Sequence, residues 1–346
     1  MPTFRQLEAL AEKFKVPIAV FFFPEPPNVK PVQSSFRTLG PAQFAKIPPK
    51  IHILMRKARA FQMSLEELNS GENPAKPVIT QQLTIDPSFD IQDVVLQVRN
   101  ALDVSLAEQF GWVDIDEALE TWRSKFFDVG IYVFKDAFGM EHADYSGFCL
   151  YDIEFPIIYV NNSTAKSRQI FTLFHELAHL LTQTSGVLVP EELFLAELAL
   201  SNQRLEVFCN RLAGHIVVPD DALEREINML PRALSPLEDV QTLAARFSVS
   251  REVIFRKFLD RELVSAKEYE KAKTEWDAQV IPRRGGGNYY FNKLTYLGEK
   301  YVSLAFKRYY ENLITEVELA SYLDVKPKNL NKLEDALLKK LNDIRI

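Results

Sequence analysis

Residues 170–181 run Ile170-Phe171-Thr172-Leu173-Phe174-His175-Glu176-Leu177-Ala178-His179-Leu180-Leu181, without a glycine or a proline. An apolar run of this length predicts a buried helix. His175 and His179 are four residues apart, so they lie one turn apart on the same helix face and both imidazoles can reach a single metal ion. Glu176 follows the first histidine and can act as general base on a metal-bound water.

The spacing His175-Glu176-Leu177-Ala178-His179 is that of the HExxH motif of zinc metallopeptidases. The chain has only five histidines, and two of them share this helical turn. A buried histidine pair next to a glutamate is costly to desolvate unless it is liganded. We therefore predict a Zn²⁺ ion held by His175 and His179, with Glu176 as the catalytic base.

A catalytic zinc needs a third protein ligand and keeps its fourth position for water. Residues 203–215 have the pattern of a second helix, which would end before Pro219 and could cross the first. Several downstream side chains are candidates for the third ligand: the carboxylates Glu191, Glu192, Glu197 and Glu206, and the imidazole of His215. The residues alone do not choose among them.

Three segments resemble the ImmA/IrrE family of metallopeptidases. Glu206-Val207-Phe208-Cys209-Asn210-Arg211-Leu212-Ala213-Gly214-His215-Ile216-Val217-Val218-Pro219 resembles the family's run E-x-x-A-N-x-F-A-x-x-L-L-x-P, with Cys209 in place of Ala and Leu212 in place of Phe. The HExxH segment is similar to its F-T-l-a-H-E-l-g-H, and Pro156-Ile157-Ile158-Tyr159-Val160-Asn161 is similar to its strand ending in I-x-v-N. In that family the glutamate is the third zinc ligand, so the resemblance implies Glu206.

Three β-rich segments precede the HExxH helix, at residues 131–134, 147–151 and 157–160. In zinc peptidases of this architecture an edge strand pairs with extended substrate. We predict the strand from Gly147 to Tyr151 as that edge; an ordinary strand of the sheet is the alternative. Tyr145 or Tyr159 could stabilise the oxyanion, and nothing in the sequence selects between them. His215 could lie near the site or make a structural hydrogen bond at a helix end.

The first residues have the form of a capped helix. Thr3 and Gln6 match a capping box, and an apolar face follows from Leu7 to Phe14. This segment resembles the last helices of an XRE-type helix-turn-helix domain, without the helices that would enter the major groove. We therefore expect residues 1–346 alone to bind DNA weakly and without sequence preference.

One pattern, L-A-x-x-[F/L]-x-V, occurs three times, at residues 10–16, 243–249 and 319–325. Each copy closes a short helix and turns into another, as in helix-turn-helix units and in many helix pairs with no role in DNA binding. Three basic residues that follow the second copy, Arg251, Arg256 and Lys257, could form a local basic patch. A later Arg-Arg-Gly-Gly-Gly run at 283–287 lacks the context of a phosphate loop, and we predict a flexible joint there.

The composition is that of an ordinary globular chain, with 47% hydrophobic and 25% charged residues. The formal net charge of −6 argues against a broadly basic nucleic-acid surface. Cys149 and Cys209 are too few for a disulfide framework and predict buried thiols in a reducing compartment. Without a signal peptide or an apolar run long enough to span a bilayer, we expect a cytoplasmic protein with no membrane partner.

The sequence thus predicts a mostly helical α+β protein, with a zincin-like core and a small mixed sheet flanked by helical domains. We expect an XRE-like remnant at 1–27, a linker and helical domain at 28–128, the metallopeptidase domain at 129–262 and a C-terminal helical domain at 263–346. The resemblance implies a zinc endopeptidase that cleaves a specific partner encoded nearby, an XRE-type repressor or a toxin, in a regulatory, stress-response or toxin–antitoxin setting. The alternative is an antitoxin or regulator that binds a toxin or DNA, with a structural or inactive zinc site.

Overall fold

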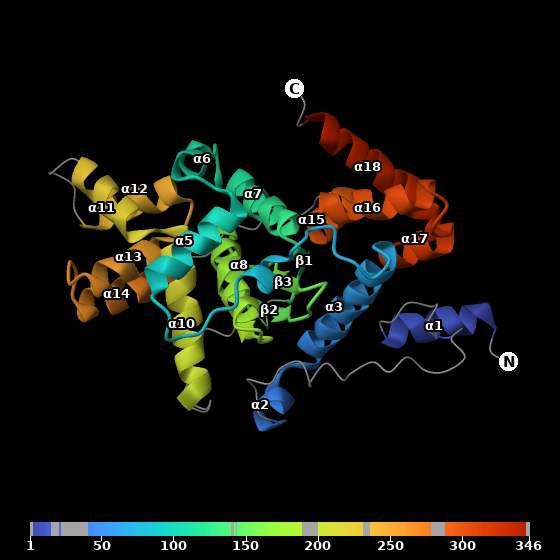
Figure 1. Ribbon diagram of the computed structural model, residues 1–346, viewed down its shortest axis with the longest axis horizontal. Coiled ribbons are helices and arrows are strands. Elements are labelled where there is room, and N and C mark those ends of the chain that lie inside the picture. Colours follow the sequence, from blue (N-terminus) through green and yellow to red (C-terminus); the bar gives the residue numbers. More distant parts are fainter. Residues whose placement is uncertain are drawn as a thin grey trace.

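The computed structural model describes residues 3–14, 21, 41–139, 142, 144–188, 200–230, 236–277 and 288–343. Helices surround one small mixed sheet (Figure 1), which confirms the mostly helical α+β expectation. None of the described helices combines the length and the apolar character that a membrane span requires.

The sheet has four strands in the order β1-β3-β2-β4. β1 (Tyr132–Asp136) runs parallel to β3 (Ile157–Asn161), and β2 (Gly147–Leu150) runs antiparallel to both β3 and the short β4 (Val187–Leu188). The three predicted strands are confirmed within two residues at each end. The predicted edge is wrong, because β4 pairs with the outer side of β2 and β2 is therefore an interior strand.

Alternate residues of β3 face two separate hydrophobic cores. Ile158 and Val160 belong to a first core that contains the HExxH helix α8 (Lys166–Leu181). Ile157 and Tyr159 point to the opposite face and belong to a second core. Successive side chains of a strand point to opposite faces of the sheet, so the sheet separates the two cores.

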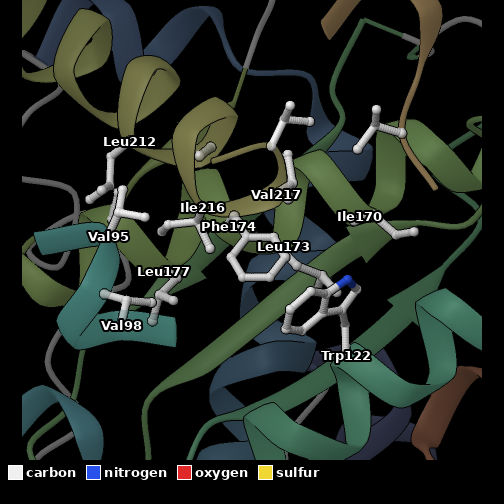
Figure 2. Packing of buried hydrophobic residues seen from close by; sticks show 14 of the residues in the cluster. Val95, Val98, Trp122, Ile170, Leu173, Phe174, Leu177, Leu212, Ile216 and Val217 are labelled. Carbon is white, nitrogen blue, oxygen red and sulfur yellow. The ribbon is translucent and has the colours of Figure 1, made fainter. Parts of the chain in front are cut away.

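The first core gathers helices from both sides of α8 in the sequence. In Figure 2, Leu173 and Phe174 of α8 lie between Trp122 and the pair Ile216 and Val217. The helices that carry this core include α5 (Ile91–Leu102), α7 (Ile115–Asp128), α8, α10 (Leu200–Val217), α12 (Pro236–Phe247) and α13 (Arg251–Asp260). The first two lie in the segment expected as a linker and helical domain, 28–128, and their N-caps are aspartates, Asp90 and Asp114.

The second core covers the other face of the sheet. It is formed by α3 (Pro49–Leu68) and by the C-terminal helices α15 (Tyr289–Leu297), α16 (Glu299–Tyr310), α17 (Glu316–Tyr322) and α18 (Leu330–Asp343). Phe61 of α3 stacks on Phe134 of β1 with ring centroids 4.3 Å apart. Lys57 of α3 connects the end of β1 to the segment after α17, because it forms ion pairs with both Asp136 and Asp324 at 3.0 Å.

The N-terminal helix α1 (Phe4–Phe14) has the predicted capping box: the Thr3 N–H donates to Gln6 Oε1 at 2.8 Å and the Gln6 N–H donates to Thr3 Oγ1 at 3.4 Å. Within the segment expected as a linker and helical domain, 28–128, the first described elements are the short helix α2 (Pro41–Lys46) and α3. The part of the expected XRE-like remnant that follows α1 falls mostly outside the described residues, and the expected flexible joint at 283–287 lies entirely outside them. The remaining helices are α4 (Ile79–Gln82), α6 (Leu106–Gly111), α11 (Asp220–Met229) and α14 (Ala266–Asp277).

Arg123 of α7 links the two cores through one buried guanidinium group. It donates to the Val133 carbonyl of β1 at 2.7 and 3.0 Å and to the Tyr296 carbonyl at the end of α15 at 3.0 Å. These bonds satisfy carbonyls on the outer side of β1 and in the last turn of a helix, which have no partner within their own element. The side chain therefore holds the C-terminal helices against the sheet.

We expect Arg123→Ala to lower the free energy of unfolding by about 3 kcal/mol, because buried carbonyls and the partner Glu120 lose their donor. Urea denaturation followed by circular dichroism measures the change. Arg225→Ala is the matched control: Arg225 also makes an ion pair, at 2.9 Å to Asp221, but both side chains are exposed, so its loss should cost less than about 0.5 kcal/mol. Equal unfolding midpoints for the two variants would contradict the assigned role of Arg123.

Candidate metal centre

Two crossing helices bring three ligand atoms together. His175 and His179 lie on α8, and Glu206 lies on α10. The Nε2 atoms of the histidines are 3.1 Å apart, and each is 3.3 Å from a different carboxylate oxygen of Glu206. All three ligand atoms lie within 4.8 Å of one another. The structure therefore unites the two predicted histidines with the glutamate that the family resemblance implies.

Hydrogen bonds behind the imidazoles fix their orientation. The Nδ1 atom of His175 lies 2.9 Å from Asn210 Oδ1, and that of His179 lies 3.2 Å from Thr184 Oγ1. The Thr184 hydroxyl donates to the His179 carbonyl at 3.1 Å, so it accepts from the imidazole. Both Nδ1 atoms then carry a proton, and the Nε2 atoms, directed at the shared point near Glu206, are the ones that would bind a metal ion.

The charges of the three ligand residues depend on one another. Burial disfavours the charged form of His179, but its contacts with Cys209 and Glu206 outweigh this and raise its pKa well above the usual range. Burial also disfavours the ionised carboxylate of Glu206, but His179 and His175 outweigh this and hold its pKa far below the usual range. An ionised carboxylate therefore faces two imidazoles in a buried site, which is a donor set that suits a divalent cation.

Glu176 is completely buried, and neither of its carboxylate oxygens has a hydrogen-bond partner among the described residues. Burial raises its pKa, against the opposing effect of His175 and His179. A buried carboxylate without a partner is costly unless something outside the protein chain bonds to it. A water molecule on a metal ion at the neighbouring histidines would supply that partner, so the residues present fit a catalytic metal ion.

The segment before β4 passes against His179 so closely that it requires a glycine. A Cβ atom on Gly186 would lie 2.5–2.8 Å from three atoms of the His179 ring. Cys149 of β2 holds this segment in place: its N–H donates to the Gly186 carbonyl at 3.0 Å, and its Sγ accepts from the Gly186 N–H at 3.2 Å. Gly186 and Thr184 thus contact His179 from one short segment.

Neither tyrosine proposed for the oxyanion is placed at the metal centre by its contacts. Tyr159 belongs to the second core on the opposite face of the sheet, and its hydroxyl donates to Asp136 at 3.3 Å. That prediction is wrong for Tyr159, because its position in β3 directs the ring away from α8. Tyr145 is partly buried, and its ring packs against the same second core.

The remaining predicted contacts have structural roles. The Nδ1 atom of His215 lies 2.9 Å from the Lys257 ammonium near the end of α10, which is the helix-end alternative. Burial and Lys257 lower its pKa to about 4, so the imidazole is neutral at pH 7. Gly147 allows β2 to pack on α8, since a Cβ there would lie 2.6 Å from the Thr172 side chain. The other carboxylate candidates, Glu191, Glu192 and Glu197, lie outside the described residues.

Sequence reasoning missed three residues that shape the site. Asn210 is one helical turn after Glu206 on the same face of α10 and lies in the segment that resembles the family, but the sequence-based prediction gave it no role in the site. Thr184 and Gly186 reach His179 only because the chain folds back after α8. No periodic pattern marks such a contact.

A comparison with protein families agrees with this geometry. The peptidase family model described as the IrrE N-terminal-like domain matches residues 128–258. This segment contains β1, β3, α8 and α10, and with them the three ligand residues and Glu176. The match supports the resemblance to ImmA/IrrE metallopeptidases over that part of the chain. No curated protein matches the sequence.

We expect Gly186→Ala to weaken metal binding by about ten- to a hundredfold, because the added methyl group displaces the His179 imidazole from its orientation. Competition with a chromophoric chelator measures the affinity. Gly214→Ala is the matched control, since a Cβ there meets no atom within 4 Å. Equal metal affinity in the two variants would show that contact with Gly186 does not position His179.

Proposed function

We propose that this protein is a zinc-dependent endopeptidase of the IrrE kind. One observation carries the proposal: His175, His179 and Glu206 converge beside Glu176, a buried carboxylate without a hydrogen-bond partner among the described residues. Three protein ligands leave one position of a tetrahedral zinc for water, as in catalytic sites. The match of residues 128–258 to a peptidase family supports the same assignment.

The protein residues divide the catalytic work. The metal, when bound, polarises the scissile carbonyl and lowers the pKa of its water. Glu176 accepts the proton of that water and passes it to the departing amine. Its raised pKa, caused by burial, suits a group that must both accept and release a proton near neutral pH. Asn210 and Thr184 keep the two imidazoles in the tautomer that leaves Nε2 free.

We further propose that the substrate is one specific protein, an XRE-type repressor or a toxin encoded nearby, in a stress-response, mobile-element or toxin–antitoxin setting. The family resemblance supports this partner class. An extended substrate segment would approach the β4 side of the sheet, because β2 is already paired on both sides. β4 is the last strand in the sheet order, so its side away from β2 is not paired with any strand that the structure describes.

A second candidate function is an antitoxin or regulator whose zinc site is structural. Structural zinc sites have four protein ligands as a rule. The group of possible ligands found among the described residues has three members. A group of three ligands, which leaves one position for water, favours the peptidase over a structural zinc site.

The purified protein should contain about one zinc ion per chain, and His179→Ala should contain almost none, because two remaining ligands cannot hold the ion. Elemental analysis after dialysis measures the content. His142→Ala, which removes a histidine that is not a member of the ligand group, is the control and should retain zinc. Full zinc occupancy in His179→Ala would refute the ligand assignment.

We expect Glu176→Gln to retain zinc and to lose cleavage of the substrate by a factor of about 10² or more, because the amide cannot accept the water's proton. The assay incubates the protein with repressors and toxins encoded by neighbouring genes, with and without chelator, and follows cleavage by gel electrophoresis and mass spectrometry. Glu224→Gln, on the exposed side of α11, is the matched control. Near wild-type cleavage by Glu176→Gln would overturn the mechanism.

A further inference from the structure

Both cysteines of the chain are buried free thiols, as the sequence predicts, and both lie in the first core. Cys209 is on α10, and Cys149 is on the interior strand β2. Neither belongs to the group of possible metal ligands found among the described residues. The contacts of Cys149 nevertheless lead to two residues of the metal centre, His179 and Glu176, from one position on the sheet.

The sulfur of Cys149 binds the segment that follows α8. It accepts from the Gly186 N–H at 3.2 Å, and the thiol donates to the Thr184 carbonyl over a longer distance of 3.8 Å. The backbone adds a further bond, because the Cys149 N–H donates to the Gly186 carbonyl at 3.0 Å. Both polar groups of the Gly186 backbone are therefore bound by one residue, Cys149.

Gly186 and Thr184 are the residues through which this segment contacts His179. Thr184 Oγ1 lies 3.2 Å from Nδ1 of the imidazole, and Gly186 packs directly on the ring. Gly186 has no side chain that could hold it there, and a buried N–H that loses its acceptor is costly. The orientation of the His179 ring therefore depends on the Cys149 sulfur, which is the acceptor for that N–H.

The same thiol lies beside the Glu176 carboxyl group. Burial raises the pKa of Glu176, and the neighbouring histidines oppose this, as does the Cys149 thiol. Burial, and next the Glu176 carboxyl, raise the pKa of Cys149 well above its usual range, so the sulfur keeps its proton. The contact is electrostatic, because neither carboxylate oxygen has a hydrogen bond of normal geometry within the described residues. A thiol proton interacts more strongly with a carboxylate than with a neutral carbonyl such as that of Thr184.

We propose that Cys149 is a positioning residue of the metal centre, whose sulfur holds Gly186 against the His179 ring and whose S–H group supports the Glu176 carboxylate. The inference rests on the proposed function, since it assigns Cys149 a role within the same site. Cys149 acts on a metal ligand through Gly186 and on the base through its thiol. One residue of the sheet thus orients two groups of α8 that perform different tasks.

The test compares side chains of different chemistry at position 149. Serine keeps a group that accepts from the Gly186 N–H and donates to Glu176, whereas valine offers only carbon atoms and alanine leaves the space empty. In competition with a chromophoric chelator, Cys149→Ser should keep its zinc affinity within about threefold of the wild type, and Cys149→Val and Cys149→Ala should lose about tenfold or more.

Stability should follow the opposite order. A buried hydroxyl is less favourable than an apolar side chain, and valine is well suited to a strand. The urea midpoint of Cys149→Val should therefore be at least as high as that of Cys149→Ser. A higher zinc affinity in Cys149→Val than in Cys149→Ser would show that only packing matters at this position and would overturn the proposal.

Ile158→Val is the matched control. Ile158 pairs with Cys149 across β2 and β3 and belongs to the same core, so the substitution removes one buried carbon atom and no hydrogen bond. It should change the zinc affinity less than about twofold. Equal losses in Ile158→Val and Cys149→Ala would show that the packing of the sheet, and not the sulfur, sets the affinity.

A double-mutant cycle tests the contact with Glu176. The shifts in urea midpoint caused by Cys149→Ala and by Glu176→Gln should not add up to the shift of the double variant, because each substitution removes the neighbour of the other. Additive shifts would refute the support of Glu176 by the thiol. None of these measurements needs a substrate, so a wild type that binds zinc and cleaves no repressor or toxin would contradict the peptidase function and not the role of Cys149.

Discussion

The contact between Glu206 and the two imidazoles of α8 is the interaction on which the metal centre depends. It joins two helices that come from either side of residues 189–199, and it places an ionised carboxylate in a buried position. Such a charge is tolerated only when it is paired or bound to a cation. The packing of α8 on α10 therefore buries the Glu206 carboxylate at the same point where the two imidazoles meet. A metal ion at that point would balance the buried charge.

The extent to which the sequence predicts the structure depends on whether a signal is local. His175, Glu176 and His179 share one helical turn, so their geometry follows from their spacing alone. Glu206 lies on a different helix, and its selection among four carboxylates needed the family resemblance. Tyr159 failed because a strand's period of two decides which face a side chain takes, and its neighbours Ile158 and Val160 occupy the face toward α8.

The short strand β4 shows a different limit. Its two residues have no pattern that distinguishes them from a loop, yet they remove the edge predicted at β2 and bring Gly186 against His179. Contacts of this kind arise from the path of the chain and not from the identity of one residue. Thr184 likewise reaches His179 only because α8 ends at Leu181 and the chain turns back toward that imidazole.

The division of the sheet between two cores has a consequence for any shortened form of this protein. Residues 128–258 include the metal ligands but not α3 or α15–α18, which cover one face of the sheet. Cutting out this segment would leave Phe134, Phe148 and Tyr159 on a bare apolar surface, and such surfaces lead to aggregation or to association with other molecules. The folded unit that holds the metal ligands is thus larger than the segment that matches the family model, because it includes α3 and α15–α18.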